Sequence, residues 1–361
     1  MSDMFLQNDA RSLLDGKHIL LIGDSNMRSL YKDIVCLLAR GSLLNQKENQ
    51  SKGLPSFLGD RRKRFSAVTK SREYVEDREY LHARNNIKVE FSFTTRVYTE
   101  AIKKKLGRMS KPPDVVLYNS TFWDLSRWGP NGDKYFRHYL VKLMKCLEKN
   151  LPPSTLVIWL TAIHPSSKLV HSGLIVKQID FIKRHFQFNV LEANRYAAEV
   201  VQSYGFDVLD VHYYTKLLCH RRRPDGVHFS TLVMRYITNL ALTHIALAWE
   251  MPLPGRVDCK DIRRIQEAIE TDGVKLKRSE PEPTCKEATN MDVKDDHTRQ
   301  FEPARKIIHA KRKVSTAEVT MNELQVTSAR KILRKNLADA WNAEFELDNI
   351  FKSRDLVPRS G

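Results

Sequence analysis

Five short apolar stretches recur along the first 250 residues, and longer segments with helical periodicity separate them. Continuous apolar runs such as the one at 19–22 are typical of strands that are buried on both faces. The alternation predicts a parallel sheet with helices on both sides. We expect an α/β protein with a three-layer, flavodoxin-like fold and a five-stranded parallel sheet, because five units are too few for an eight-stranded barrel. The predicted strands are residues 18–25, 87–96, 114–119, 155–160 and 206–211.

Helices are predicted between these strands. The segment 26–40 carries apolar residues at helical spacing and ends at Gly41, a residue type that favours helix termination. The polar segment 41–87 is interpreted as an irregular insertion near the rim of the site. The one-sided alternation of residues 87–96 favours a strand near the sheet edge. The other predicted helices are a lead-in helix within 1–17 and the segments 100–106, 135–147, 188–204 and 230–249.

The composition changes after residue 253. Residues 1–253 are long enough for one sizeable core and are predicted to form one domain. Residues 254–318 are highly charged and poor in aromatic side chains, which predicts a disordered linker. Residues 319–352 regain apolar positions at helical spacing and predict an amphipathic helix that docks a partner protein, or this domain, through residues 320–351. Residues 353–361 form a tail whose end resembles a protease-site remnant.

The sequence contains no apolar run near the length of about 20 residues that spans a membrane. Its N-terminus carries acidic residues and lacks the basic-then-apolar pattern of a secretory signal. The cysteines are odd in number and widely spaced, at positions 36, 146, 219, 259 and 285. This spacing predicts reduced thiols without a disulfide framework or a zinc site, and therefore a cytoplasmic or nuclear protein that is not secreted.

The net charge of +17 lies mostly before Met251 and concentrates in three basic runs at 61–64, 103–105 and 221–223. Such runs are either solvated surface charge or the recognition surface for an anionic partner. We interpret the first two runs as solvated surface. The third run, Arg221, Arg222 and Arg223, directly precedes a candidate catalytic loop and is expected to bind an anionic substrate.

Polar residues follow three of the apolar runs or lie in an adjoining loop. Ser25 ends the first run, Asn119 ends the third, and Asp225 and His228 precede the last predicted helix. The carboxyl ends of parallel strands meet at one edge of a sheet, where open α/β folds place their ligands. These side chains are therefore expected to converge. The alternatives are that Asp24 or Ser25 only caps a helix, that Asn119 is a turn residue, and that Asp-x-x-His is a surface loop.

The converging residue types suit nucleophilic catalysis. A serine hydroxyl needs a base to remove its proton, and a histidine has a pKa near neutrality. His228 is the candidate base, and Asp225 is the candidate for orienting its imidazole. The Ser25 backbone N–H and the Asn119 amide are candidate oxyanion donors. We expect no cofactor and no metal, because the spacing of His212, His220 and His228 fits no tetrahedral ligand set.

These residues resemble the signature of the SGNH (GDSL-type) hydrolase superfamily. More narrowly, residues 10–253 resemble the animal PC-esterase domain-containing proteins. That resemblance implies a catalytic domain with a flavodoxin-like fold, an acyl-serine intermediate and an O-acylated substrate, within a group associated with acylated carbohydrates. The segments that carry it are Gly23-Asp24-Ser25, Tyr31-Lys32-Asp33, Thr95-Arg96-Val97-Tyr98, Asn119-Ser120, Trp123-Asp124-Leu125-Ser126-Arg127, Phe206-Asp207-Val208-Leu209-Asp210 and Asp225-Gly226-Val227-His228.

One departure concerns the oxyanion site. Superfamily members generally offer a glycine N–H after the second strand, where this chain has Thr95 and Arg96. Arg96 is therefore a candidate oxyanion donor in its place, and the alternative is an incomplete oxyanion site. Trp123 and Asp124 are expected to contact the substrate, and core packing is an equally favoured alternative for Trp123.

Two classes of function remain. The first is a serine esterase, an acyl hydrolase or acyltransferase, that acts on an O-acylated small molecule or glycan and favours an anionic one. The alternative is a non-catalytic binding or scaffold protein with the same fold and a basic surface. Nucleic-acid binding ranks last, because the sequence lacks interleaved aromatic and basic surface motifs.

Overall fold

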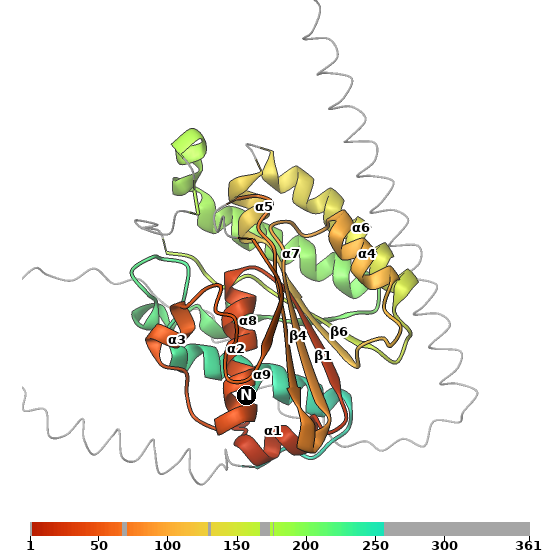
Figure 1. The fold of residues 1–361 in the computed structure, drawn as a ribbon. Coiled ribbons are helices and arrows are strands. Elements are labelled where there is room, and N and C mark those ends of the chain that lie inside the picture. Colours follow the sequence, from red (N-terminus) through yellow and green to blue (C-terminus); the bar gives the residue numbers. More distant parts are fainter. Residues whose placement is uncertain (1, 67–70, 129–130, 167–173, 176, 256–361) are drawn as a thin grey trace, which may run out of the picture. The chain divides into compact units, whose positions relative to one another are not determined.

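The apolar runs form the parallel part of one sheet in a computed structural model that describes residues 2–66, 71–128, 131–166, 174–175 and 177–255 (Figure 1). The parallel strands lie in the order β4-β1-β5-β6-β7. Numbered among themselves along the chain, they have the order 2-1-3-4-5 of flavodoxin-like folds, so the predicted fold class is confirmed. Their bounds are β1 (His18–Gly23), β4 (Ile87–Phe93), β5 (Val115–Asn119), β6 (Leu156–Leu160) and β7 (Asp207–Leu209).

The sheet has seven strands rather than the predicted five. The two additional strands are β2 (Arg61–Phe65) and β3 (Glu76–His82), and both lie in the segment 41–87 that was expected to be irregular. They add antiparallel to β4 and complete the order β2-β3-β4-β1-β5-β6-β7. The expected position of β4 near an edge is therefore wrong, because β4 lies between β3 and β1 and the edges are β2 and β7.

Charge explains why β2 and β3 lack an apolar pattern. Two of the inward-facing residues of β3, Glu76 and Arg78, are charged, and ion pairs satisfy them. Arg78 is buried and donates two hydrogen bonds to the Asp60 carboxylate, at 2.7 and 2.9 Å. Glu76 is buried and pairs with Arg28 at 2.7 Å. Strand β2 is an edge strand, and charged side chains on such an edge disfavour pairing with other chains.

Helices cover the sheet on both faces. Helices α1 (Gln7–Leu13), α2 (Ser25–Arg40) and α9 (Thr231–Ala248) lie on one side, and α4 (Glu100–Gly107), α6 (Gly132–Asn150) and α7 (Phe186–Ser203) lie on the other (Figure 1). Helix α2 packs against α9, and α6 packs against α7. The short elements are α3 (Gln46–Gln50), α5 (Phe122–Arg127), α8 (Val211–Thr215) and the 3₁₀ turns η1 (Ala83–Asn85), η2 (Lys177–Arg184) and η3 (Cys219–Arg221).

The end of α2 follows the sequence prediction. Gly41 caps the helix in the left-handed conformation with φ 72°, and its N–H donates to the carbonyls of Cys36 and Leu37. Strand β1 is buried along its whole length, as its continuous apolar run requires. The turn between β1 and α2 is therefore held by a buried strand on one side and a well-capped helix on the other.

The predicted linker at 254–318, apart from its first two residues, and the predicted helix and tail at 319–361 lie outside the described residues. These remain predictions. In the described part of the chain, no helix combines the length and the apolarity that crossing a bilayer demands.

Candidate active site

The turn after β1 holds Ser25 at the first position of α2. A Cβ atom at Gly23 would lie closer than 3.0 Å to the backbone oxygen of Asn119, so this position requires glycine. Asp24 is the N-cap, and its Oδ1 accepts from the Asn26 N–H at 2.8 Å. Burial raises the pKa of the Asp24 carboxyl, and the hydrogen bond from Asn26 opposes this rise. The capping alternative thus applies to Asp24, which leaves the Ser25 hydroxyl available for other contacts.

The loop that carries His228 is tightly folded on itself. The Arg223 N–H donates to the His228 carbonyl at 2.8 Å, and the Gly226 N–H donates to the Arg223 carbonyl at 3.0 Å. Gly226 has φ 76°, a conformation that favours glycine. From outside the loop, the Ser166 N–H donates to the Gly226 carbonyl at 2.8 Å. These bonds fix the direction in which the His228 ring leaves the backbone.

Ser25, His228 and Asp225 are in hydrogen-bond contact. The Ser25 Oγ lies 2.7 Å from His228 Nε2, and His228 Nδ1 lies 2.9 Å from Asp225 Oδ2. The other carboxylate oxygen of Asp225 accepts from the N–H groups of Val227 and His228, at 2.9 and 2.8 Å. The side chains of His228 and Asp225 are partly exposed, so a substrate can reach this end of the sheet.

The local charges favour an ionised Asp225. Burial raises the pKa of its carboxyl, but the hydrogen bond and charge of His228 and the two backbone N–H groups outweigh this and hold the pKa well below its usual range. An ionised carboxylate accepts from Nδ1–H, which leaves Nε2 of a neutral imidazole as the acceptor for the Ser25 hydroxyl. This is the protonation pattern that makes a histidine a base toward a serine.

The two expected oxyanion donors near Ser25 differ in their availability. The first intrahelical hydrogen bond of α2 runs from the Arg28 N–H to the Asp24 carbonyl. The Ser25 N–H lies before this bond and therefore has no acceptor within the helix. The Asn119 amide is buried and donates to the Leu160 carbonyl at 2.6 Å. This bond occupies one of its two amide hydrogens and fixes the plane of the group.

The structure places Arg96 and Asp124 in supporting roles. The Arg96 guanidinium lies over the rings of Trp128 and Tyr139, at 4.2 and 4.3 Å from their centroids, and its Nε is 3.9 Å from Asp124. Asp124 is 0% exposed and accepts from the Val97 N–H at 2.7 Å. A substrate therefore has no access to Asp124, whereas the role of Arg96 as an oxyanion donor stays a prediction.

Trp123 is partly buried, with its ring edge-to-face against Phe93 at 5.9 Å and beneath the Arg127 guanidinium at 5.3 Å. Both are packing contacts of a side chain that is not fully covered.

The three arginines of the run 221–223 differ in their contacts. Arg222 donates to the His164 carbonyl at 2.6 Å and lies over Phe229, whereas Arg221 is exposed and Arg223 lies 3.9 Å from Asp225.

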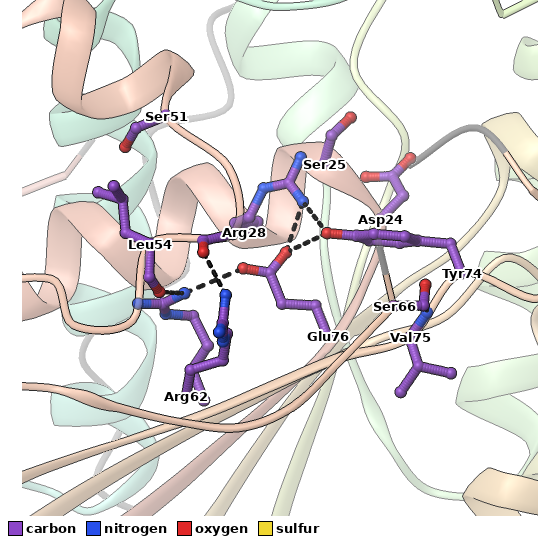
Figure 2. Close-up of polar contacts among 12 residues, drawn as sticks. Asp24, Ser25, Arg28, Ser51, Leu54, Arg62, Ser66, Tyr74, Val75 and Glu76 are labelled. Atoms are coloured by element: carbon purple, nitrogen blue, oxygen red, sulfur yellow. Dashed lines mark hydrogen bonds and ion pairs between the residues drawn. The ribbon is translucent and has the colours of Figure 1, made fainter. Parts of the chain in front are cut away.

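A charged network behind Ser25 was missed by the sequence reasoning (Figure 2). Arg28 lies one helical turn after Ser25 and donates to Glu76 at 2.7 Å and to the Tyr74 hydroxyl at 3.4 Å. The Tyr74 hydroxyl in turn donates to Glu76 at 2.8 Å. Burial raises the pKa of Glu76, but Arg28 outweighs this effect and lowers it. The position of Arg28 three residues after Ser25 was the only signal in the sequence, and nothing there identified its partners.

A small apolar pocket of about 30 Å³ begins at Asn26, the residue after Ser25, and at Asn119. Side chains from α2, α5, the end of β6 and α9 line it, among them Leu30, Phe122 and Ile237. The Asn26 Oδ1 is buried there and has no hydrogen-bond partner among the described residues. The pocket thus combines an apolar interior with amide groups at the end nearest Ser25.

The fold is that of a flavodoxin-like α/β protein in which a serine, a histidine and an aspartate meet beside the carboxyl ends of the strands. By sequence, the chain is similar to the PC-esterase domain-containing proteins, and the expected resemblance is confirmed. It is 32% identical to PC-esterase domain-containing protein 1A of Homo sapiens over 262 residues, which are 71% of this chain and 58% of that protein. It is 34% identical to protein 1B of Homo sapiens over 259 residues, which are 69% of this chain and 59% of that protein. The chain thus spans under two thirds of the length of these relatives.

No protein-family profile matches the chain. Among solved structures, it is similar to the acetylxylan esterase Axe2 from Geobacillus stearothermophilus, with 12% identity and a TM-score of 0.37 over 64% of this chain and 95% of that one. It is also similar to a DUF4886 family protein from Bacteroides uniformis, with 15% identity and a TM-score of 0.36 over 72% and 95%. Likenesses at this level carry no conclusion about activity.

Proposed function

We propose that this chain is a serine-dependent carboxylic ester hydrolase or acyltransferase with Ser25 as nucleophile, His228 as base and Asp225 as the residue that orients His228. The observation that carries the proposal is the unbroken chain of contacts from Ser25 Oγ through His228 to Asp225, at 2.7 and 2.9 Å. The family name of the relatives, which includes a PC-esterase domain, agrees with it.

The proposed reaction begins when Ser25 Oγ attacks the ester carbonyl while His228 Nε2 takes the hydroxyl proton. The carbonyl π electrons move to its oxygen, which the Ser25 N–H and the free amide hydrogen of Asn119 stabilise. The electrons then return, the bond to the alcohol breaks, and His228 gives its proton to the departing alcohol. Water or a second hydroxyl attacks the acyl-serine, loses its proton to His228, and releases the acid or the new ester as Ser25 regains its hydrogen.

The substrate class is an O-acylated small molecule or glycan. The apolar pocket beside Asn26 and Asn119 is small, at about 30 Å³, so it suits only a short acyl group, whose apolar surface is favourably buried there. Arg221 and Arg223 are the basic side chains of the loop that are not committed to the His164 carbonyl, and we propose that they favour an anionic substrate. Reversal of both charges is expected to weaken the binding of an anionic ester and to reduce its salt dependence.

A fluorophosphonate probe tests this function without knowledge of the substrate, because it reacts with an activated serine. The wild-type chain is expected to be labelled, and Ser25→Ala and His228→Ala are expected to lose labelling. Ser29→Ala is the matched control, since Ser29 lies one turn later on α2 and its hydroxyl bonds to the Ser25 carbonyl. A folded wild-type chain that is not labelled would favour the non-catalytic binding protein instead.

A further inference from the structure

A groove with many basic side chains lies on the face of the sheet opposite α2. It is bounded by the start of β1, by β3 and β4, by α4 and by the segment that leads to β5. Its volume is about 820 Å³. Figure 1 shows α4 across the sheet from α2, so the groove and Ser25 lie on different sides of the sheet. We call it the basic groove and define it by its seven cations, Lys17, Arg64, Lys88, Lys104, Lys105, Arg108 and Lys111.

Cations outnumber carboxylates in the basic groove by seven to two. Both carboxylates are already paired. Asp77 accepts from Arg64, and Glu90 lies 2.6 Å from Lys88 Nζ and 3.4 Å from Lys105 Nζ. Burial raises the pKa of Glu90, but the neighbouring His18, Lys105 and Lys88 outweigh this and lower it. The groove therefore has an excess of positive charge that no acidic residue of its lining neutralises.

Several donors in the basic groove have no partner in the described part of the chain. The side chains of Lys104, Arg108 and Lys111 are exposed and make no hydrogen bond or ion pair among residues 2–255 as described. His18 is 7% exposed, and none of the described residues lies within hydrogen-bond distance of its buried Nε2. The Glu90 carboxylate, 3.7 Å away, is close enough for an ion pair but not for a hydrogen bond. The hydrogen-bonding position at Nε2 is therefore one that a ligand oxygen can occupy.

Two basic runs that are far apart in the sequence meet in this groove. Arg64 belongs to the run 61–64 on β2, whereas Lys104 and Lys105 belong to the run 103–105 on α4. Each run alone is typical of solvated surface charge, which was the interpretation from sequence. The antiparallel addition of β2 and β3 extends the sheet next to α4 and brings both runs to one concave surface.

We propose that the basic groove binds a compact polyphosphate, meaning a small molecule that carries two or more phosphate groups. Phosphate oxygens accept strong charge-assisted hydrogen bonds from ammonium and guanidinium groups. A volume of about 820 Å³ lies in the range of small-molecule sites. The cations line several walls of the groove, so they reach separate phosphate groups of one ligand. An extended nucleic acid or a lipid surface needs only an exposed strip of charge and gains nothing from the cavity.

Calorimetric titration of the full chain with inorganic tripolyphosphate at physiological salt tests the proposal. The charge-reversal variant K104E/R108E/K111E is expected to weaken binding by about tenfold or more, because three attractive contacts become repulsive. Its matched control is K47E/K145E/R195E, which makes the same change of charge at exposed residues outside the groove and is expected to lose less than about threefold.

A second variant tests the cavity without a change of charge. Ala101 lines the groove from the exposed side of α4, so Ala101→Trp fills space there and is expected to reduce tripolyphosphate binding by about tenfold. Both groove variants are expected to keep the wild-type circular dichroism spectrum and fluorophosphonate labelling, because the groove is separate from Ser25. A wild-type chain that binds tripolyphosphate but is not labelled would therefore count against the proposed catalysis and not against the polyphosphate site.

Three results would overturn the polyphosphate site. The first is a wild-type chain that binds no tripolyphosphate at millimolar concentration. The second is a control variant that loses as much affinity as the groove variant, since binding would then depend on net charge only. The third is a short single-stranded oligonucleotide, or a vesicle of anionic phospholipid, that binds more tightly than tripolyphosphate and equally well to Ala101→Trp. That result would mean that the basic side chains bind an extended polyanion rather than a compact polyphosphate.

Discussion

Replacing Asp225 by asparagine separates the proposed role of this carboxylate from simple packing. In the folded chain one carboxylate oxygen accepts from the Val227 and His228 backbone N–H groups, and the other lies 2.9 Å from His228 Nδ1. Asparagine keeps one oxygen for the backbone but places an NH₂ group opposite Nδ1. Because NH₂ is a donor, Nδ1 must become the acceptor, and the imidazole proton moves to Nε2.

A protonated Nε2 cannot accept the hydroxyl proton of Ser25, which lies 2.7 Å away. We therefore expect the second-order rate constant of fluorophosphonate labelling to fall by about 10⁴-fold, the size of effect that the wrong imidazole tautomer has in a serine protease. This factor corresponds to about 5 kcal/mol of transition-state stabilisation. The thermal midpoint should change little, because the backbone hydrogen bonds to the loop are kept.

The assay is the time course of labelling at several probe concentrations, with hydrolysis of p-nitrophenyl acetate as a second readout. Asp207→Asn is the matched control, because Asp207 also pairs with a histidine, His244, at 2.8 Å but is distant in sequence from the loop. The control is expected to label at the wild-type rate. A folded Asp225→Asn variant that labels within tenfold of wild type would refute the assignment of Asp225 as the residue that sets the His228 tautomer.

Three further predictions concern the surroundings of the site. Gly23→Ala places a Cβ closer than 3.0 Å to a backbone oxygen of the adjacent strand and should lower the free energy of unfolding by about 3 kcal/mol in urea denaturation, whereas Gly107→Ala should change it by less than about 1 kcal/mol. Burial is the main reason why the pKa of Lys32 is lowered to about 7 from 10.5, so the unfolded state binds more protons between these values. The free energy of unfolding should therefore rise with pH across this window, by up to about 1.4 kcal/mol per pH unit, and Lys32→Met should abolish that slope. Arg28→Met removes the 2.7 Å ion pair of the buried Glu76, which keeps Arg78 at 3.2 Å and the Tyr74 hydroxyl, and should cost about 1.5–3 kcal/mol. The double variant Arg28→Met/Glu76→Gln should lose less, and equal losses would contradict the pairing.

The parallel strands could be predicted because burial on both faces demands continuous apolar runs, and β1 and β5 have them. Strands β2 and β3 could not be predicted by that rule. Arg78 and Glu76 occupy inward-facing positions of β3 that an apolar side chain would otherwise fill. Their partners Asp60 and Arg28 lie 18 and 48 residues away in the sequence, and periodicity contains no information about such pairs.

In the candidate site, too, the sequence predicts what depends on local spacing and strand order, but not what depends on contacts with residues elsewhere in the chain. The rule that parallel strands end at one sheet edge places Ser25 near the His228 loop, and the spacing of three residues within that loop places Asp225 beside His228. The direction of the Arg96 side chain depends on Trp128 and Tyr139, which lie on later elements. Long arginine side chains follow such aromatic surfaces, and the sequence gives no means to place them.

The distance between the proposed nucleophile and base depends on how α2 packs against α9. Ser25 begins α2, and His228 lies three residues before α9 begins at Thr231. Asp33, buried on α2, accepts from Arg235 Nε at 2.8 Å and from the Thr238 hydroxyl at 2.7 Å, and both donors belong to α9. These bonds join the two helices within about two turns of the site, where the hydroxyl and the imidazole must stay in contact. The motif residues supply the reacting groups, but a buried ion pair between the helices that carry them holds those groups within hydrogen-bond reach.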